Sequence, residues 1–458
     1  MNPYLSHIFE KKFVMNFLFL MLFFSFIAGN LAINLNILLI LIFGLAFYKL
    51  DVFKINYTFL DKLIFFTFFY ILLNGIYNNY FYKSNNLTAD STVLIKSFLF
   101  LRFLLLYFLI NFLIKKDIIN LKIFFIASSV AVIFVSLDLF YQFYFGYDIF
   151  GFEAIKGRRL SGPFGDELIA GSFLFKFGIF SFFLYPVFLK IDNKFILWFL
   201  FIALFFLLFF SLLISGNRTP FFLFLITISC IFFFEKKLRK FFLLFLSIVI
   251  LLISMIYNFH QTTKDHLGSY KNKIRSFFYI FSEDNIITEE ELEKTYRYDK
   301  KNNMFYTLEH KGKLYKINNT YIKEFKTGFL TWKVNKFFGG GIKSFILNCG
   351  RANIPNCVNH PHNYYLEILS ELGLFGFLLF SLIFFVITFK TFIKKYFTNS
   401  SLKHNYIITP FIFLFLMEIF PLKNTGSFFS TFNATYFFLI LSILVSLVRK
   451  NNLIEKKI

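Results

Sequence analysis

Residues 359–376 read NHPHNYYLEILSELGLFG, and we interpret the rest of the chain around this stretch. Apolar residues recur at every third position between residues 366 and 375, which is a helical spacing. Pro361 precedes the helix, where its missing N–H costs little. The stretch therefore predicts a membrane helix that begins at the lipid–water boundary, with His362 and Asn363 at its first turn.

The start of such a helix favours a particular chemistry. The unpaired N–H groups and the dipole of a helix N-terminus attract anions. The same field lowers the pKa of a nearby histidine, which favours a neutral imidazole that can accept a proton. His362 is therefore a candidate general base, and the alternative is a surface histidine beside a helix cap.

The composition indicates a polytopic membrane protein. The chain has 458 residues, of which 57% are hydrophobic, and its mean hydropathy is +0.65. The net charge of +22 does not indicate a nucleic-acid partner, because the charged residues lie between apolar runs. The lipid bilayer is the expected partner.

Apolar runs of about 17–25 residues mark transmembrane helices. The sequence predicts an all-α fold with about twelve of them and one large outer loop. The predicted spans are 13–29, 31–48, 62–77, 93–114, 121–145, 167–189, 195–214, 219–234, 238–257, 364–389, 406–421 and 428–448. We divide the chain into spans one to nine (1–257), the large loop (258–361) and spans ten to twelve (362–458).

The positive charges predict the orientation. Lys and Arg are concentrated in alternate connections, which places both termini on the cytoplasmic side. The short outer loops hold few cations: Lys83, Lys156, Arg158, Arg159, Arg218 and Lys423. The large loop then lies on the outer side of the membrane.

The outer arginines are candidate ligand residues. Arg158 and Arg159 lie in GRRLSGPFGDELIAGSFL, and Arg218 lies in SGNRTPFF. All three are expected on the same face as His362, which favours a shared anionic ligand such as a diphosphate. The alternative is that they reach toward lipid headgroups.

The large loop has some predicted structure of its own. Residues 271–281 fit a short amphipathic helix, and residues 304–317 alternate as in a β-hairpin. Residues 321–338 return to helical spacing, and three glycines at 339–341 allow a close backbone approach.

Two further pairings are expected. Asp138 and Lys176 fall in the outer halves of neighbouring spans, where buried charges normally pair, and we expect an ion pair between them. Cys349 and Cys357 flank a short turn, and they can form a disulfide if the loop faces an oxidising compartment.

The spacing of the His-Asn stretch resembles a known signature. His362-Asn363, nine residues, Gly373, two residues and Gly376 is similar to the motif of the O-antigen ligase and polymerase family of bacterial membrane proteins. The segments GRRLSGPFGDE, SGNRTPFF and FFGGGIKSF add to the resemblance. It implies a bacterial inner-membrane enzyme with a periplasmic site that takes glycan from undecaprenyl diphosphate. The resemblance also implies that this histidine and the outer arginines work without a metal.

The residues and the resemblance predict the same reaction. His362 takes the proton of an acceptor hydroxyl, which attacks the anomeric carbon with inversion. Arg158, Arg159 and Arg218 stabilise the diphosphate leaving group. Supporting roles are expected for four residues: His360, Asn363, Lys343 and Glu371. No cofactor or metal is expected; His360 and His362 could form a metal pair, but no third ligand lies nearby.

Three functions remain open. The leading hypothesis is a ligase that joins the glycan to a lipid A–core sugar, and the close alternative is a polymerase that extends another lipid-linked repeat. Another glycan or a protein could also accept the sugar. A transporter of an anion or glycan is the alternative of another class, although the chain shows no internal symmetry of the transporter kind.

Overall fold

The structure is a computed structural model. It describes residues 3–84, 92–154, 159–188, 193–236, single positions between 239 and 254, 307–310, 313–316, 320–354, 357–398 and 400–455. Arg158, most of the predicted span at 238–257 and the predicted helix at 271–281 lie outside the described residues.

The described part of the chain is nearly all helical. Its α-helices are α1 (Pro3–Ala28), α2 (Asn30–Tyr48), α3 (Phe59–Ser84), α4 (Thr92–Phe100), α5 (Arg102–Lys115), α6 (Leu121–Phe145), α7 (Ala170–Phe188), α8 (Lys194–Ile214), α9 (Arg218–Phe234), α14 (Thr320–Trp332), α15 (Phe345–Arg351), α16 (Tyr364–Thr388), α17 (Lys394–Phe397), α18 (Thr409–Glu418) and α19 (Thr431–Glu455). Two short strands, β1 (Thr307–His310) and β2 (Lys313–Lys316), form an antiparallel pair with Leu308 opposite Tyr315.

In the part of the chain that the structure describes, seven helical segments are long and apolar enough to cross a membrane. They are Glu10–Ala28, Asn30–Phe53, Phe59–Tyr80, Thr92–Lys115, Leu121–Phe145, Tyr364–Phe397 and Thr431–Asn451. Four shorter apolar helices lie in α7, α8, α9 and α18. The helical class expected from the sequence is confirmed, whereas the count of twelve spans stays a prediction.

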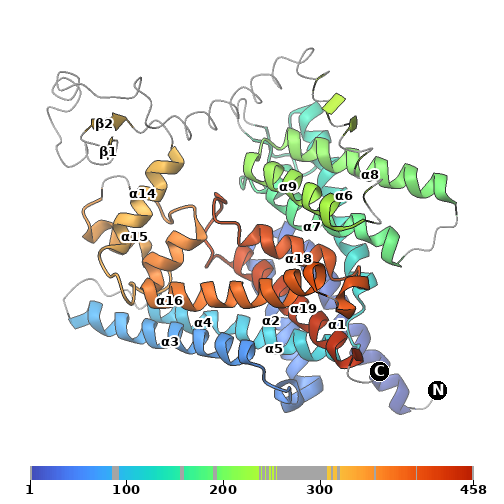
Figure 1. Cartoon of the computed structure of the whole chain (residues 1–458), viewed down its shortest axis with the longest axis horizontal. Coiled ribbons are helices and arrows are strands. Elements are labelled where there is room, and N and C mark those ends of the chain that lie inside the picture. Colours follow the sequence, from blue (N-terminus) through green and yellow to red (C-terminus); the bar gives the residue numbers. More distant parts are fainter. Residues whose placement is uncertain are drawn as a thin grey trace.

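The last helix lies at the centre of the bundle (Figure 1). In the most apolar 18-residue stretch of α19, 89% of the residues are buried, against 33% in the corresponding stretch of α2. The helix packs along α5, and its end is anchored by Arg449, whose Nη2 lies 2.5 Å from Asp61 Oδ1 in α3. Tyr107 of α5 donates to the same carboxylate oxygen at 2.7 Å. These contacts join three helices at the end of the molecule where both termini lie, away from α14 and α15 (Figure 1).

Helix α16 is interrupted at Gly373, whose φ is +67°. The amides of Leu374 and Phe375 donate to the carbonyls of Lys336 and Phe337 at 2.8 and 3.1 Å. A Cβ on Gly373 would lie 2.3 Å from the carbonyl oxygen of Phe337, so a side chain here would clash with backbone.

The glycines at 339–341 make the same contact from the other side. The amide of Gly341 donates to the carbonyl of Glu371 at 2.7 Å, and a Cβ on Gly339 would lie 2.4 Å from that carbonyl oxygen. The close approach predicted for these glycines is therefore made against α16. The predicted helix at 321–338 ends earlier, at Trp332, because the following residues turn to reach α16.

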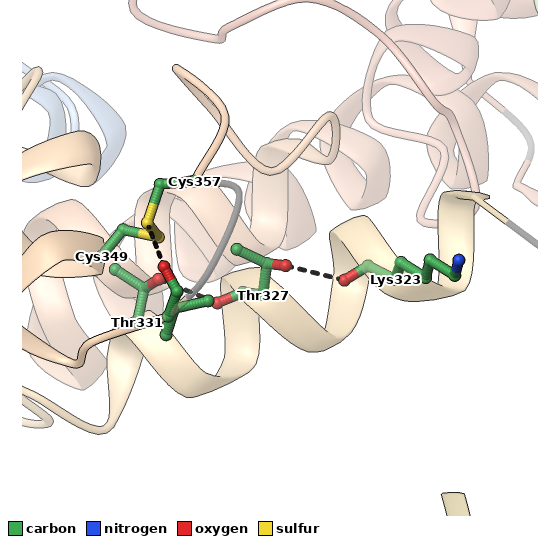
Figure 2. The surroundings of a disulfide bond; sticks show 6 residues. Lys323, Thr327, Thr331, Cys349 and Cys357 are labelled. Atoms are coloured by element: carbon green, nitrogen blue, oxygen red, sulfur yellow. Dashed lines mark hydrogen bonds between the residues drawn. A yellow bond between two sulfur atoms is a disulfide. The ribbon is translucent and has the colours of Figure 1, made fainter. Parts of the chain in front are cut away.

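A disulfide joins Cys349 of α15 to Cys357, with their Cα atoms 6.0 Å apart. Figure 2 shows this bond beside α14, where Thr331 donates to the carbonyl of Thr327 at 2.8 Å. Cys349 is buried in a small apolar cluster with Phe345 and Ile354. The disulfide and this cluster hold the segment that leads into the His-Asn stretch.

Candidate functional site

A cavity of about 430 Å³ brings together four of the residues predicted from the sequence. Arg159, Arg218, His360 and His362 all line it. Because these residues come from three separate parts of the chain, the fold creates the site. Arg158 lies outside the described residues, so Arg159 alone represents the predicted arginine pair.

The two arginine-bearing segments lie against each other. Gly216 has φ of +67°, and a Cβ there would lie 3.3 Å from Arg159 Cγ. Two residues later, Arg218 begins α9 after the buried Asn217. A Cβ on Gly171 of α7 would lie 2.5 Å from Asn217 Cβ, so α7 also packs closely against this turn. The turn at residues 215–217 thus brings Arg159 and Arg218 to the same cavity.

His362 has an unusual backbone conformation. Its φ is +53°, in the left-handed region that residues other than glycine rarely adopt. The amide of Thr425 holds it by donating to the carbonyl of His362 at 3.0 Å. His362 precedes the cap of α16 and is not in its first turn, which corrects the position predicted from the sequence.

Asn363 is the N-cap residue of α16. Its Oδ1 accepts from the amides of Tyr365 and Leu366 at 3.0 and 3.2 Å. Its Nδ2 donates to the carbonyl of Pro421 at 2.7 Å. Asn363 is buried and does not line the cavity. Its contacts therefore hold the start of α16 and the neighbouring loop in place, and we do not assign it to ligand binding.

His360 lies against His362, with the two ring centroids 4.2 Å apart. Burial lowers the pKa of His360 to about 4, and the nearby His362 and Lys343 add to the effect. Its Nε2 is buried and has no hydrogen-bond partner among the described residues. At neutral pH, the ring is therefore uncharged and adds no charge beside His362.

Lys343 and Glu371 stabilise the wall behind the cavity. Lys343 Nζ lies 2.5 Å from Ser427 Oγ, and that hydroxyl donates to Glu367 Oε1. The amide of Lys343 donates to Glu371 Oε2 at 2.8 Å. Neither Lys343 nor Glu371 lines the cavity, although Ser427 does. Their supporting roles stay a prediction.

A buried cluster of three charges lies at the cavity, and the sequence did not predict it. Lys176 Nζ lies 2.8 Å from Glu418 Oε1, and Lys423 Nζ lies 2.7 Å from Glu418 Oε2. Tyr364 also donates to Glu418 at 2.7 Å. Both lysines line the cavity. Among the described residues, Glu418 is the one carboxylate within ion-pair distance of either lysine.

The expected ion pair between Asp138 and Lys176 is wrong. Asp138 Oδ1 instead accepts from the amide of Ile149 at 2.9 Å, in the loop after α6. Lys176 and Glu418 each stand out in the sequence as ionisable residues within an apolar run. Their pairing could not be predicted, because 242 residues separate them.

A carboxylate that the sequence did not single out lies beside His362. Glu324 of α14 has its Oε1 3.8 Å from His362 Nε2. It lies in the large loop, where no motif marked it. Within the described residues, no group of three His, Cys, Asp or Glu side chains is placed to hold a metal ion.

The site and the fold together define a helical membrane protein with a cationic cavity beside a histidine. Residues 203–381 match the family model described as O-antigen ligase. The match includes Arg218, His362 and the interruption at Gly373. No curated protein matches the chain.

Proposed function

We propose that the protein is a glycosyltransferase that moves a glycan from a polyprenyl-diphosphate carrier to an acceptor hydroxyl. One observation carries the proposal: guanidinium, ammonium and imidazole groups from distant parts of the chain line a single cavity. The family match to O-antigen ligases supports the same reaction class.

The cations suit the donor's diphosphate. Arg159 and Arg218 can each form two parallel hydrogen bonds with phosphate oxygens. Lys176 and Lys423 add two ammonium groups that share one carboxylate, so the wall of the cavity keeps an excess of positive charge. That charge stabilises the diphosphate as it leaves with the electron pair of the glycosidic bond.

His362 is the proposed general base. It accepts the proton of the acceptor hydroxyl while the oxygen attacks the anomeric carbon from the face opposite the diphosphate. The configuration at that carbon is then inverted. In this scheme the cations provide the electrostatic stabilisation of the leaving group, so the reaction does not require a metal.

We place the reaction at the periplasmic face of a bacterial inner membrane, with both termini cytoplasmic. The distribution of Lys and Arg and the disulfide between Cys349 and Cys357 support this orientation.

The proposed donor is a glycan on undecaprenyl diphosphate, and the proposed acceptor is a lipid A–core sugar. A polymerase would instead extend a second lipid-linked repeat. A deletion strain separates the two: loss of all polymer from lipopolysaccharide indicates a ligase, and a single attached repeat indicates a polymerase.

The direct test is transfer by purified protein in a lipid bilayer, with a defined lipid-linked donor and candidate acceptors. We expect His362→Ala to reduce the transfer rate by about 100- to 10,000-fold, because a general base is lost. His404→Ala is the matched control, since this exposed histidine does not line the cavity. Transfer by His362→Ala at the rate of the unchanged protein would exclude the proposed base, and a transporter would become the better reading.

A further inference from the structure

Glu324 projects from α14 toward the histidine of the cavity. Its Oε1 lies 3.8 Å from His362 Nε2, which is within ion-pair distance but longer than a hydrogen bond. The side chain of Glu324 is 16% exposed, and that of His362 is 32% exposed. The carboxylate is therefore largely removed from solvent at the place where it faces the imidazole.

One short loop holds both residues. The side-chain amide of Asn424 donates to Glu324 Oε2 at 3.2 Å, which leaves Oε1 facing the imidazole. The next residue, Thr425, donates its amide to the carbonyl of His362 at 3.0 Å. The loop is itself fixed, because Asn363 donates to the carbonyl of Pro421. The relative position of the carboxylate and the imidazole is thus set by hydrogen bonds on both sides.

Other charged groups near His362 do not replace this carboxylate. His360, on one side of the ring, is an uncharged neighbour, and Lys343 is a cation that points to Ser427. Among the described residues, Glu324 is the one carboxylate within 4.0 Å of His362. A carboxylate that accepts a hydrogen bond from one imidazole nitrogen fixes the tautomer and stabilises the imidazolium that forms during proton transfer.

We propose that Glu324 is a positioning residue for His362, an inference that rests on the proposed transferase function. Glu324 accepts a hydrogen bond from the N–H at Nε2, so Nδ1 is the nitrogen that takes the acceptor's proton. The acceptor oxygen bonds to the anomeric carbon, and the bond from that carbon to the diphosphate oxygen breaks with its electron pair. The proton then resides on His362, and Glu324 stays ionised throughout.

The test compares Glu324→Gln with Glu324→Asp in the bilayer transfer assay. The Gln variant keeps the shape but loses the charge, so kcat should fall by about 10- to 1,000-fold while the KM for the lipid-linked donor is unchanged. The Asp variant restores the charge and should recover part of kcat. Glu153→Gln is the matched control, because this exposed carboxylate does not line the cavity.

A kcat for Glu324→Gln equal to that of the unchanged protein would overturn the inference, provided that His362→Ala is inactive. If His362→Ala also keeps full activity, both the proposed transferase mechanism and the role of Glu324 fail. If the Gln variant does not fold, Asn424→Ala decides, because it frees the carboxylate without removing it. A lower kcat with unchanged donor KM supports positioning; an unchanged kcat overturns it.

Discussion

Lys176 Nζ lies 2.8 Å from Glu418 Oε1, although 242 residues separate the two in the chain. Lys423 takes the other carboxylate oxygen, and all three side chains are at most 6% exposed. Two ammonium groups thus share one carboxylate at the surface of a cavity. An excess of buried positive charge is costly without a counter-charge, so the cluster favours an anionic ligand.

Glu418→Gln should be the most destabilising change in this cluster. It leaves two buried ammonium groups without their carboxylate, and we expect the free energy of unfolding to fall by about 3–5 kcal/mol. Lys423→Met leaves the pair of Lys176 and Glu418 intact, so it should destabilise less and raise the donor KM. Thermal unfolding in nanodiscs compares the stabilities of the two variants and the unchanged protein. Equal stability of the Gln variant and the unchanged protein would contradict the ion-pair account.

Arg218→Lys tests the shape of the cation as well as its charge. Lysine keeps the charge but cannot form the paired hydrogen bonds of a guanidinium, so kcat/KM for the donor should fall by about 10- to 100-fold. Arg351→Lys on α15 is the control, because Arg351 does not line the cavity. Full activity of Arg218→Lys would show that a point charge is sufficient.

His360 should make the folding stability depend on pH. Its pKa in the folded protein is about 4, below its ordinary value of 6.5, chiefly because the ring is buried. Between these two values the unfolded chain binds a proton that the folded chain does not bind. Stability should therefore decrease as the pH falls from 6.5 toward 4, and it should be fully present above 6.5.

The His360→Gln variant tests whether His360 causes this loss of stability at low pH. Melting temperatures measured between pH 7 and pH 4 should fall less steeply for this variant than for the unchanged protein. His404→Gln removes an exposed histidine and should leave the slope as it is. Identical slopes for His360→Gln and the unchanged protein would show that His360 does not control the acid sensitivity.

The disulfide can be tested by chemistry and by stability. Non-reducing peptide mass spectrometry should find Cys349 linked to Cys357. Replacing both with serine should lower the free energy of unfolding by about 2–3 kcal/mol, because a short loop is no longer closed in the unfolded chain. Cys230→Ser is the control, since Cys230 is a free cysteine in α9. Two free thiols in the peptide map would contradict the link.

Much of the helical architecture could be predicted, because it depends on local hydropathy. The predicted span at 121–145 coincides with α6, Leu121–Phe145. The positions of Arg218 and His362 were also indicated locally, by a glycine-containing turn and by a helix start. Their meeting in one cavity was an inference from membrane sidedness, and the described residues place them there.

The partners of buried charges could not be predicted in the same way. Asp138 and Lys176 have similar depths in neighbouring spans, yet the rotation of each helix about its axis decides which side chains meet. Lys176 faces Glu418, and Asp138 faces the loop at Ile149. Glu324 was missed for a related reason: the side chain that holds its carboxylate, Asn424, lies 100 residues away in the chain.

The interruption at Gly373 makes the outer part of the chain inseparable from the long helix that follows it. The amides of Leu374 and Phe375 use the carbonyls of Lys336 and Phe337 as acceptors. A fragment that lacks Lys336 and Phe337 would leave these two amides without their acceptors, which is costly wherever water cannot replace them. A chimaera of two related proteins should therefore exchange the segment at residues 336–341 and helix α16 together, so that their contacting glycines come from the same protein.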